Sequence, residues 1–185
     1  MGVTCTLRSA TVPQLDALAR RPELLPVFFS ADPGELLPRP TLWQMLLRRK
    51  PDVPADLLEG PESIEIDLDK AWHGMHFLFT GRGDGGDLPA SYLIAGGTQI
   101  GKEGARGLQP DQVEAFRQFV HSLPEEELRR RYDPKRMTEL DIYPTIIWER
   151  DSLEALDYIL EYHQQLWAFL RDASVERLGC VILIA

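Results

Sequence analysis

The sequence predicts an α+β fold: a helix-rich single domain with a small mixed sheet that includes the N- and C-terminal strands. Three observations favour this class. The last six residues, CVILIA at 180–185, form a continuous apolar run that is typical of a strand buried on both faces. Val3, Cys5 and Leu7 alternate with polar residues, as a strand near the N-terminus requires. Several segments between these ends carry apolar residues at helical spacing.

Length, charge and cysteine content narrow the class of protein. With 185 residues and 44% hydrophobic residues, the chain can bury one substantial core. A net charge of -9 repels phosphates, so we expect no nucleic-acid partner and no membrane partner. No apolar stretch approaches the roughly 20 residues of a membrane span. The two cysteines are too few for a disulfide framework, which favours a cytoplasmic location.

The first helix follows the N-terminal strand, and a proline-rich segment follows the helix. Thr11 can cap a helix that has Pro13 in its first turn and ends near Arg21. Prolines then punctuate residues 22–62, where only the stretch 41–50 has the pattern of an amphipathic helix. This segment is either a lid or an extended wrap over the core, and the sequence leaves both open.

The middle of the chain alternates helices with glycine-rich turns. We expect Asp67 to cap a helix that runs to about Phe79, and residues 88–95 to form a short helix. A flexible loop at 80–87 separates the two. The apolar stripe of the first of these helices consists of Leu68, Trp72, Met75 and Phe79.

Four further helices are expected before the final strand. Pro110 opens the first, Ser122 and Glu125 form a capping box for the second, and Asp133 caps the third. The longest helix begins at Asp151, with Glu154 completing its capping box, and runs to about Ser174. One of its two buried stripes consists of Leu153, Leu156, Leu160, His163, Trp167 and Leu170.

Two long motifs resemble the bacterial YfbM-like family. The first, DLDKAWHGMHFLFTG at 67–81, contains an Asp-Lys-x-Trp start. The second, at 125–148, ends with the signature residues Ile142, Tyr143, Pro144 and Trp148. The resemblance extends from Asp67 to Ala185 and implies an α+β domain in a bacterial cytoplasmic protein. The family is of unknown function, so the resemblance supplies no catalytic residues.

The stretch GGTQIGKE at 96–103 fits the phosphate-binding pattern G-x-x-x-x-G-K through Gly96, Gly101 and Lys102. A working site needs Ser or Thr after the lysine and a helix that begins there. Glu103 stands in that position, and the glycines before Pro110 oppose helix formation. We therefore expect a glycine-rich turn with a solvated lysine, and no nucleotide cofactor.

The histidines permit metal binding but do not predict it. His73 and His76 are three residues apart on one expected helix, so one metal could reach both. A metal site needs at least a third ligand, and none can be assigned. A structural role or a polar spot in a cleft is favoured for this pair. His163 interrupts an apolar stripe, which favours a buried histidine with satisfied hydrogen bonds.

A candidate cleft is suggested by the aromatic residues around Pro144. Tyr143 and Trp148 flank this turn, and Arg106 and Glu139 could complete a cleft lined with polar groups. The competing interpretation, which we favour, is that the aromatic side chains fasten the turn to the core.

The sequence leaves the function unknown. The favoured interpretation is a non-enzymatic cytoplasmic binding or protein-interaction module, since no complete catalytic set, cofactor motif or metal site is present. Its acidic surface suits a basic protein partner. The alternative is a hydrolase-type enzyme with a cleft near His73, His76 and Tyr143.

Overall fold

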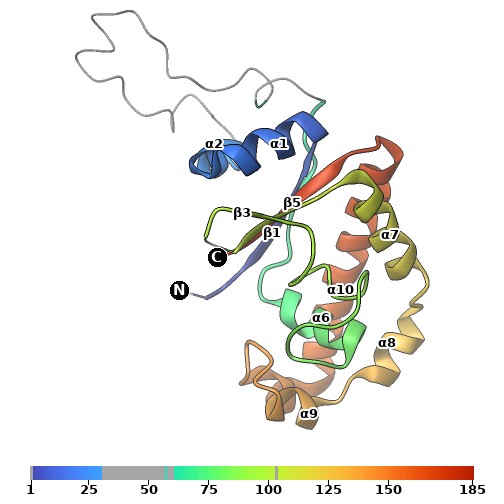
Figure 1. The fold of residues 1–185 in the computed structure, drawn as a ribbon. Coiled ribbons are helices and arrows are strands. Elements are labelled where there is room, and N and C mark those ends of the chain that lie inside the picture. The colour runs from blue at the N-terminus through green and yellow to red at the C-terminus, as the bar shows by residue number, and fades with distance from the viewer. Residues whose placement is uncertain (1, 31–56, 58–60, 103) are drawn as a thin grey trace, which may run out of the picture.

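The structure, a computed structural model, describes residues 2–30, 57, 61–102 and 104–185. Within these residues the chain forms a five-stranded sheet in the order β2-β1-β5-β4-β3, with helices on both sides (Figure 1). The strands are β1 (Cys5–Ala10), β2 (Glu65–Asp67), β3 (Thr98–Ile100), β4 (Ala105–Leu108) and β5 (Gly179–Ile184). The chain is therefore α+β, and both terminal segments contribute strands, as the sequence predicts.

All four strand pairings in the described sheet are antiparallel, so the expectation of a mixed sheet is wrong. The two terminal strands run in opposite directions, with Cys5 opposite Ile184 and Ala10 opposite Gly179. A tight hairpin joins β3 to β4, and such a short connection permits only antiparallel pairing. The C-terminal strand lies at the centre of the sheet, where Val181 and Ile182 are fully buried on opposite faces.

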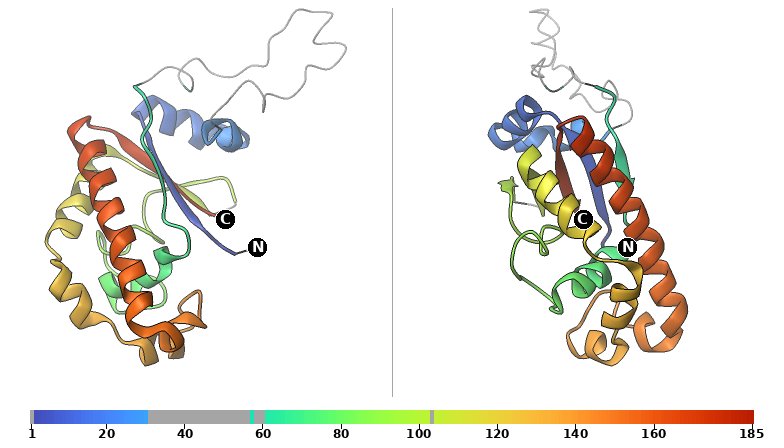
Figure 2. Two further views of the ribbon diagram at one scale, coloured as in Figure 1. Left: turned by 180° about the vertical axis from the view of Figure 1, so that it is seen from behind. Right: turned by 90° about the vertical axis from the view of Figure 1, so that its right-hand side faces the viewer.

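The helices are distributed unequally over the two faces of the sheet (Figure 2). They are α1 (Val12–Arg20), a 3-10 turn (Pro22–Leu24), α2 (Leu25–Phe28), α6 (Ala71–Thr80), α7 (Pro110–His121), α8 (Glu125–Arg131), α9 (Pro134–Glu139) and α10 (Ile147–Val175). The first three of these elements pack on one face, where Leu18 and Phe28 join Val181 in a small core. The other helices enclose the larger core, which contains Trp148 and Phe169.

Local sequence signals place several helix ends correctly. Thr11 caps α1 in a capping box with Gln14, and Pro13 lies in the first turn. Pro110 opens α7, and the Asp133 side chain accepts a hydrogen bond from the Arg136 backbone N–H at the start of α9. These signals depend only on neighbouring residues, so tertiary contacts do not displace them.

Two predicted helix caps are wrong. Asp67 ends strand β2, where it pairs with Thr6, and α6 begins only at Ala71. Glu125 is the first residue of α8, but Pro124 occupies the N-cap position and the Ser122 hydroxyl instead donates to the Phe119 carbonyl. Asp67 and Ser122, which were expected to cap these helices, form other contacts instead.

The longest helix also begins earlier than predicted. It starts at Ile147 and is interrupted at Ser152, which has non-helical angles of φ 38° and ψ -97°. Asp151 forms an ion pair with Arg150 instead of capping the helix. Leu153 was expected in the buried stripe but is 70% exposed, because the interruption breaks the helical register of the first turns.

The glycine-rich segment forms part of the sheet. The stretch GGTQIGKE was expected to be a turn between helices, but Thr98–Ile100 is strand β3. Gly101 provides the positive φ of 66° at the tip of the hairpin, and Lys102 is exposed. Residues 88–94 form turns instead of the expected short helix.

The helix expected at 41–50 and the glutamate at 103 lie outside the described residues. At the two ends of the proline-rich segment, Leu24 and Leu57 are buried in the core beneath α1. The Gln14 side-chain amide donates to the Leu57 carbonyl at 3.2 Å. The domain extent and the choice between a lid and a wrap stay predictions. Among the described helices, none is both long and apolar enough to cross a membrane.

Candidate functional site

His73 connects two loops to α6 through both of its ring nitrogens. Its Nδ1 accepts a hydrogen bond from the Tyr143 backbone N–H at 2.9 Å, and Nε2 therefore donates to the Gly83 carbonyl at 2.6 Å. The Trp72 ring stacks on the imidazole, with centroids 4.8 Å apart. Burial lowers the pKa of His73, against a smaller opposing effect of the Gly83 hydrogen bond. The neutral imidazole acts as a bridge between loops.

His76 is fully buried one turn later in α6. Its Nε2 lies 3.3 Å from the Thr80 hydroxyl oxygen, whereas its Nδ1 has no hydrogen-bond partner in the described structure. Burial, and to a lesser extent the neighbouring His73, lower the pKa of His76 to about 4. His76 is therefore uncharged at neutral pH and is enclosed by the core.

Tyr143 holds the N-terminal segment in place. Its hydroxyl oxygen accepts a hydrogen bond from the Val3 backbone N–H at 3.1 Å. The Trp72 indole N–H donates to the Val3 carbonyl at 3.3 Å, and the two aromatic rings lie 6.4 Å apart. The hydroxyl of Tyr143 thus serves a backbone contact and does not face the imidazole of His73.

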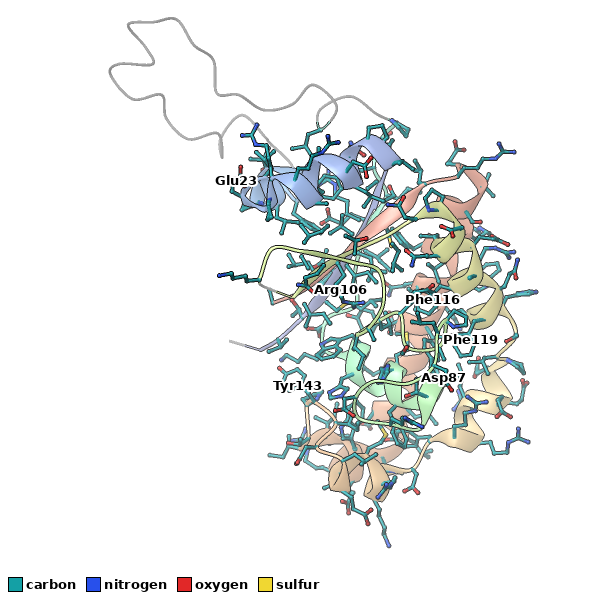
Figure 3. The ribbon with its side chains drawn as sticks, in the orientation of Figure 1. Glu23, Asp87, Arg106, Phe116, Phe119 and Tyr143 are labelled. Atoms are coloured by element: carbon teal, nitrogen blue, oxygen red, sulfur yellow. The ribbon has the colours of Figure 1, made fainter. Side chains whose placement is uncertain are left out.

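Trp148 and Arg106 are interior residues. Trp148 is fully buried, and its indole N–H donates to the Ile142 carbonyl at 2.6 Å. Arg106 lies in β4, and its side chain is largely buried. Figure 3 shows it apart from Tyr143. Its guanidinium donates to four carbonyls of one turn, those of Tyr92, Leu93, Ala95 and Gly96. This arrangement fixes the turn to the sheet.

Glu139 ends α9 on the surface. Its carboxylate pairs with Arg136 at 2.9 Å, and both side chains are more than half exposed. The structure therefore brings together His73, His76 and the backbone of Tyr143, while the Trp148, Arg106 and Glu139 side chains have other partners. These contacts favour the structural interpretation of the predicted cleft residues.

A groove lies beside these residues, at the interrupted start of α10. It has a volume of about 450 Å³ and is formed by the start of α6, the Pro144 loop and α10. We call it the acidic groove, and its lining residues are Asp69, Lys70, Pro144, Ile146, Ile147, Asp151, Glu154, Ala155 and Tyr158. Three carboxylates and one ammonium group make its charge negative.

Hydrogen bonds hold one wall of the acidic groove. The Tyr158 hydroxyl donates to Asp69 Oδ2 at 2.8 Å and accepts from the Lys70 backbone N–H at 3.1 Å. Burial raises the pKa of Tyr158 above its usual range, and the hydrogen bond to Asp69 adds to this effect. Asp69 has a positive φ of 44°, and its N–H donates to Asp67 Oδ1 at 2.7 Å. The Asp69 carboxylate is thereby fixed at the groove.

The backbone of α10 is strained next to the groove residue Asp151. Ser152 has a positive φ of 38°, a conformation that costs a non-glycine residue on the order of 1–3 kcal/mol. The Tyr132 hydroxyl lies 2.9 Å from the Ser152 carbonyl and 3.2 Å from that of Trp148. Burial, and to a lesser extent Asp151, raise the pKa of Tyr132 to about 12. Strained residues of this kind concentrate at functional sites.

One exposed apolar side chain lines the acidic groove. Ile146 is 70% exposed, although large aliphatic residues of this kind are usually buried. Glu154, next to Leu153, has no ion-pair partner among the described residues. The groove thus presents apolar contact area next to an unpaired carboxylate.

The acidic groove offers carboxylates, one ammonium group and apolar side chains as contacts. No group of three or more His, Cys, Asp or Glu residues that could hold a metal occurs in the described part of the chain. The sequence does not predict the groove, because Asp69 and Tyr158 are 89 positions apart and meet only in the fold.

Comparisons with known proteins agree with this fold. A family model described as "Domain of unknown function (DUF1877)" matches residues 1–183. The crystal structure of YfbM from Escherichia coli, a protein of unknown function, is similar with a TM-score of 0.68 and 16% sequence identity. The match covers 98% of this chain and 99% of that one. No curated protein matches the chain. The chain therefore belongs to the DUF1877 family and is YfbM-like, as the two long motifs suggested.

Proposed function

We propose that this protein is a non-enzymatic binding module of the bacterial cytoplasm that recognises a partner protein through the acidic groove. The occupant would be a short peptide segment that carries a Lys or Arg side chain beside an apolar one. The observation that carries the proposal is the position of the exposed Ile146 in the same groove as the Asp69, Asp151 and Glu154 carboxylates.

Charge complementarity selects this occupant over a neutral or acidic one. Each carboxylate that faces the groove would attract a basic side chain, and the net charge of -9 would speed its approach. Asp151 is already paired with Arg150, so Glu154 and Asp69 are the stronger attractors. The exposed Ile146 side chain adds apolar burial, which a purely ionic contact lacks.

The hydrolase alternative has less support. It requires His73, His76 and Tyr143 to converge on an open pocket, but His76 is fully buried. Both ring nitrogens of His73 are occupied by backbone groups, one of them the Tyr143 N–H. A general base at either histidine would first have to break one of these contacts or open the core.

A peptide titration tests the proposal. We expect a ten-residue peptide of alternating Lys and Leu to shift the amide resonances of residues 146–158 in a saturable way, and more weakly at high salt. Peptides with Glu for Lys, or Ser for Leu, should bind at least tenfold more weakly, because each lacks one of the two contacts.

Two variants on the same helix complete the test. Glu154→Lys should weaken binding about tenfold, because it replaces an attraction by a repulsion. Glu161→Lys makes the same charge change at an exposed position of α10 that does not line the groove, and should leave the affinity within twofold. Equal losses in both variants would show that only the overall charge matters and would refute the groove as the binding site.

A further inference from the structure

A second cavity lies between the end of α7 and the middle of α10. Its volume is about 490 Å³, within the range of small-molecule sites, and it shares no residue with the acidic groove. We call it the aromatic cavity, and its lining residues are Val120, His121, Leu123, His163, Gln164, Trp167 and Ala168. These residues are apolar, aromatic or uncharged polar, apart from the histidines.

His163 is half-buried at this cavity, and its covered Nε2 lacks the hydrogen bond that a buried polar atom is expected to have. Neither of its ring nitrogens has a hydrogen-bond partner among the described residues, and Nε2 is covered by protein atoms. Its ring is held by an edge contact with Phe79, at a centroid distance of 6.0 Å. The expectation of a satisfied histidine at this position is therefore wrong. Buried polar groups are nearly always paired, so an unpaired imidazole at a cavity needs an explanation.

Flat aromatic groups form one side of the aromatic cavity. The rings of His121 and Trp167 lie 6.2 Å apart and are inclined by 32°. The Arg171 guanidinium lies 5.1 Å from the Trp167 ring centroid, which fixes the indole in place. The side chains of Val120 and Leu123 are almost fully buried beneath the opening. Such a lining favours a planar ring over a branched aliphatic group.

We propose that the aromatic cavity binds a small, uncharged, planar aromatic molecule with one hydrogen-bonding group. The ligand's ring would pack against Trp167 and His121, and its polar group would donate a hydrogen bond to His163 Nδ1, the ring nitrogen that protein atoms do not cover. No Asp, Glu, Lys or Arg lines the cavity, so a charged ligand would lose hydration without gaining an opposite charge. This site is independent of the acidic groove and of the function proposed for it.

Indole and indane form a matched pair of probes. They have nearly the same shape, but only indole carries an N–H that can donate to an imidazole nitrogen. We expect indole to shift the resonances of residues 120–123 and 163–168, including the indole N–H signal of Trp167, in a saturable way. Indane should bind about threefold to tenfold more weakly, which corresponds to one neutral hydrogen bond.

His163→Phe separates the hydrogen bond from the packing. Phenylalanine keeps a ring against Phe79 but has no nitrogen, so indole affinity should fall about threefold to tenfold while indane affinity is unchanged. An equal indole affinity in wild type and His163→Phe would overturn the role given to His163. The absence of saturable shifts at the lining residues at millimolar indole would overturn the site itself.

A second variant tests the site through a surface residue, in case His163→Phe does not fold. Gln164 is exposed at the rim, so Gln164→Arg can obstruct the cavity without disturbing the core, and it should abolish the indole shifts. Glu161→Arg, on the same helix but outside the cavity, should leave them intact. Retained indole binding in Gln164→Arg would place the ligand elsewhere and refute the proposal.

Discussion

His76 shows how burial makes one residue sensitive to pH. The imidazole is fully enclosed, one nitrogen has no partner in the described structure, and its pKa is lowered from 6.5 to about 4. Below pH 6.5 the unfolded chain binds a proton at this position and the folded chain does not. His76 therefore lowers the stability as the pH falls from 6.5 towards 4, and leaves it unaffected above 6.5. Burial also lowers the pKa of His73 and of His163, so these two residues likewise reduce the stability as the pH falls.

We predict that wild type loses about 2 kcal/mol of unfolding free energy between pH 7 and pH 5 through His76 alone. His76→Leu removes the titrating group while roughly preserving side-chain volume, so the loss over this range should be smaller by that amount. Urea denaturation of both proteins at several pH values measures the difference. Parallel curves for the two proteins would contradict the prediction. The comparison cancels the contribution of carboxylates, which are the same in both chains.

At the scale of secondary structure, the close approach of α6 and α10 depends on Gly74. A Cβ added at this position would lie 2.7 Å from the Trp148 ring and 2.8 Å from Ile159 Cδ1. Both neighbours are fully buried and have little room to move. Glycine therefore sets the distance between the two helices that carry the walls of the acidic groove.

We predict that Gly74→Ala destabilises the protein, although alanine is the better helix former. The propensity gain is about 1 kcal/mol, whereas overpacking costs about 1–3 kcal/mol, so we expect a net loss of up to about 2 kcal/mol. Denaturant unfolding measures this value. Glu161→Ala, at an exposed position of α10, should change stability by less than about 0.5 kcal/mol. A more stable Gly74→Ala protein would show that α6 and α10 are less tightly packed than described.

The elements that the sequence predicts correctly are those set by local signals. Strand β5 follows from its apolar run, and the starts of α1 and α9 follow from Thr11 and Asp133. The errors arise where distant residues compete. Asp67 pairs with Thr6 across the sheet, and the Arg150 ion pair and the angles of Ser152 displace the expected cap at Asp151.

The candidate sites are even less accessible from sequence. The acidic groove forms only where Asp69, Tyr158 and the Pro144 loop lie close together. No periodic pattern in the sequence predicts that these distant residues are neighbours. Of the predicted cleft residues, His73 and Tyr143 do come together, but through a backbone N–H. For the aromatic cavity, the sequence identified His163 as unusual within its stripe, and only the fold revealed that its imidazole lacks a partner.

At the scale of the whole molecule, the sheet separates two layers of unequal size. Among the described residues, the larger cluster contains 31 buried residues and the cluster beneath α1 and α2 contains 10. Both proposed sites use α10, which belongs to the larger layer. The sites are therefore carried by the layer with more buried apolar contacts, which resists local opening better than a thinner layer does.

We predict that amides of α1 and α2 exchange with solvent through a lower-energy opening than amides of α10 and β5, because fewer buried side chains hold the thinner layer. Hydrogen exchange followed by mass spectrometry measures the two opening energies. Leu18→Ala, in the thinner layer, should speed exchange in α1 and leave α10 nearly unchanged. Phe169→Ala, in the larger layer, should speed exchange in both layers, because α10 supports the sheet on which α1 rests. If Leu18→Ala accelerates α10 as much as α1, the two layers open together, and ligand binding to α10 would then protect α1 equally.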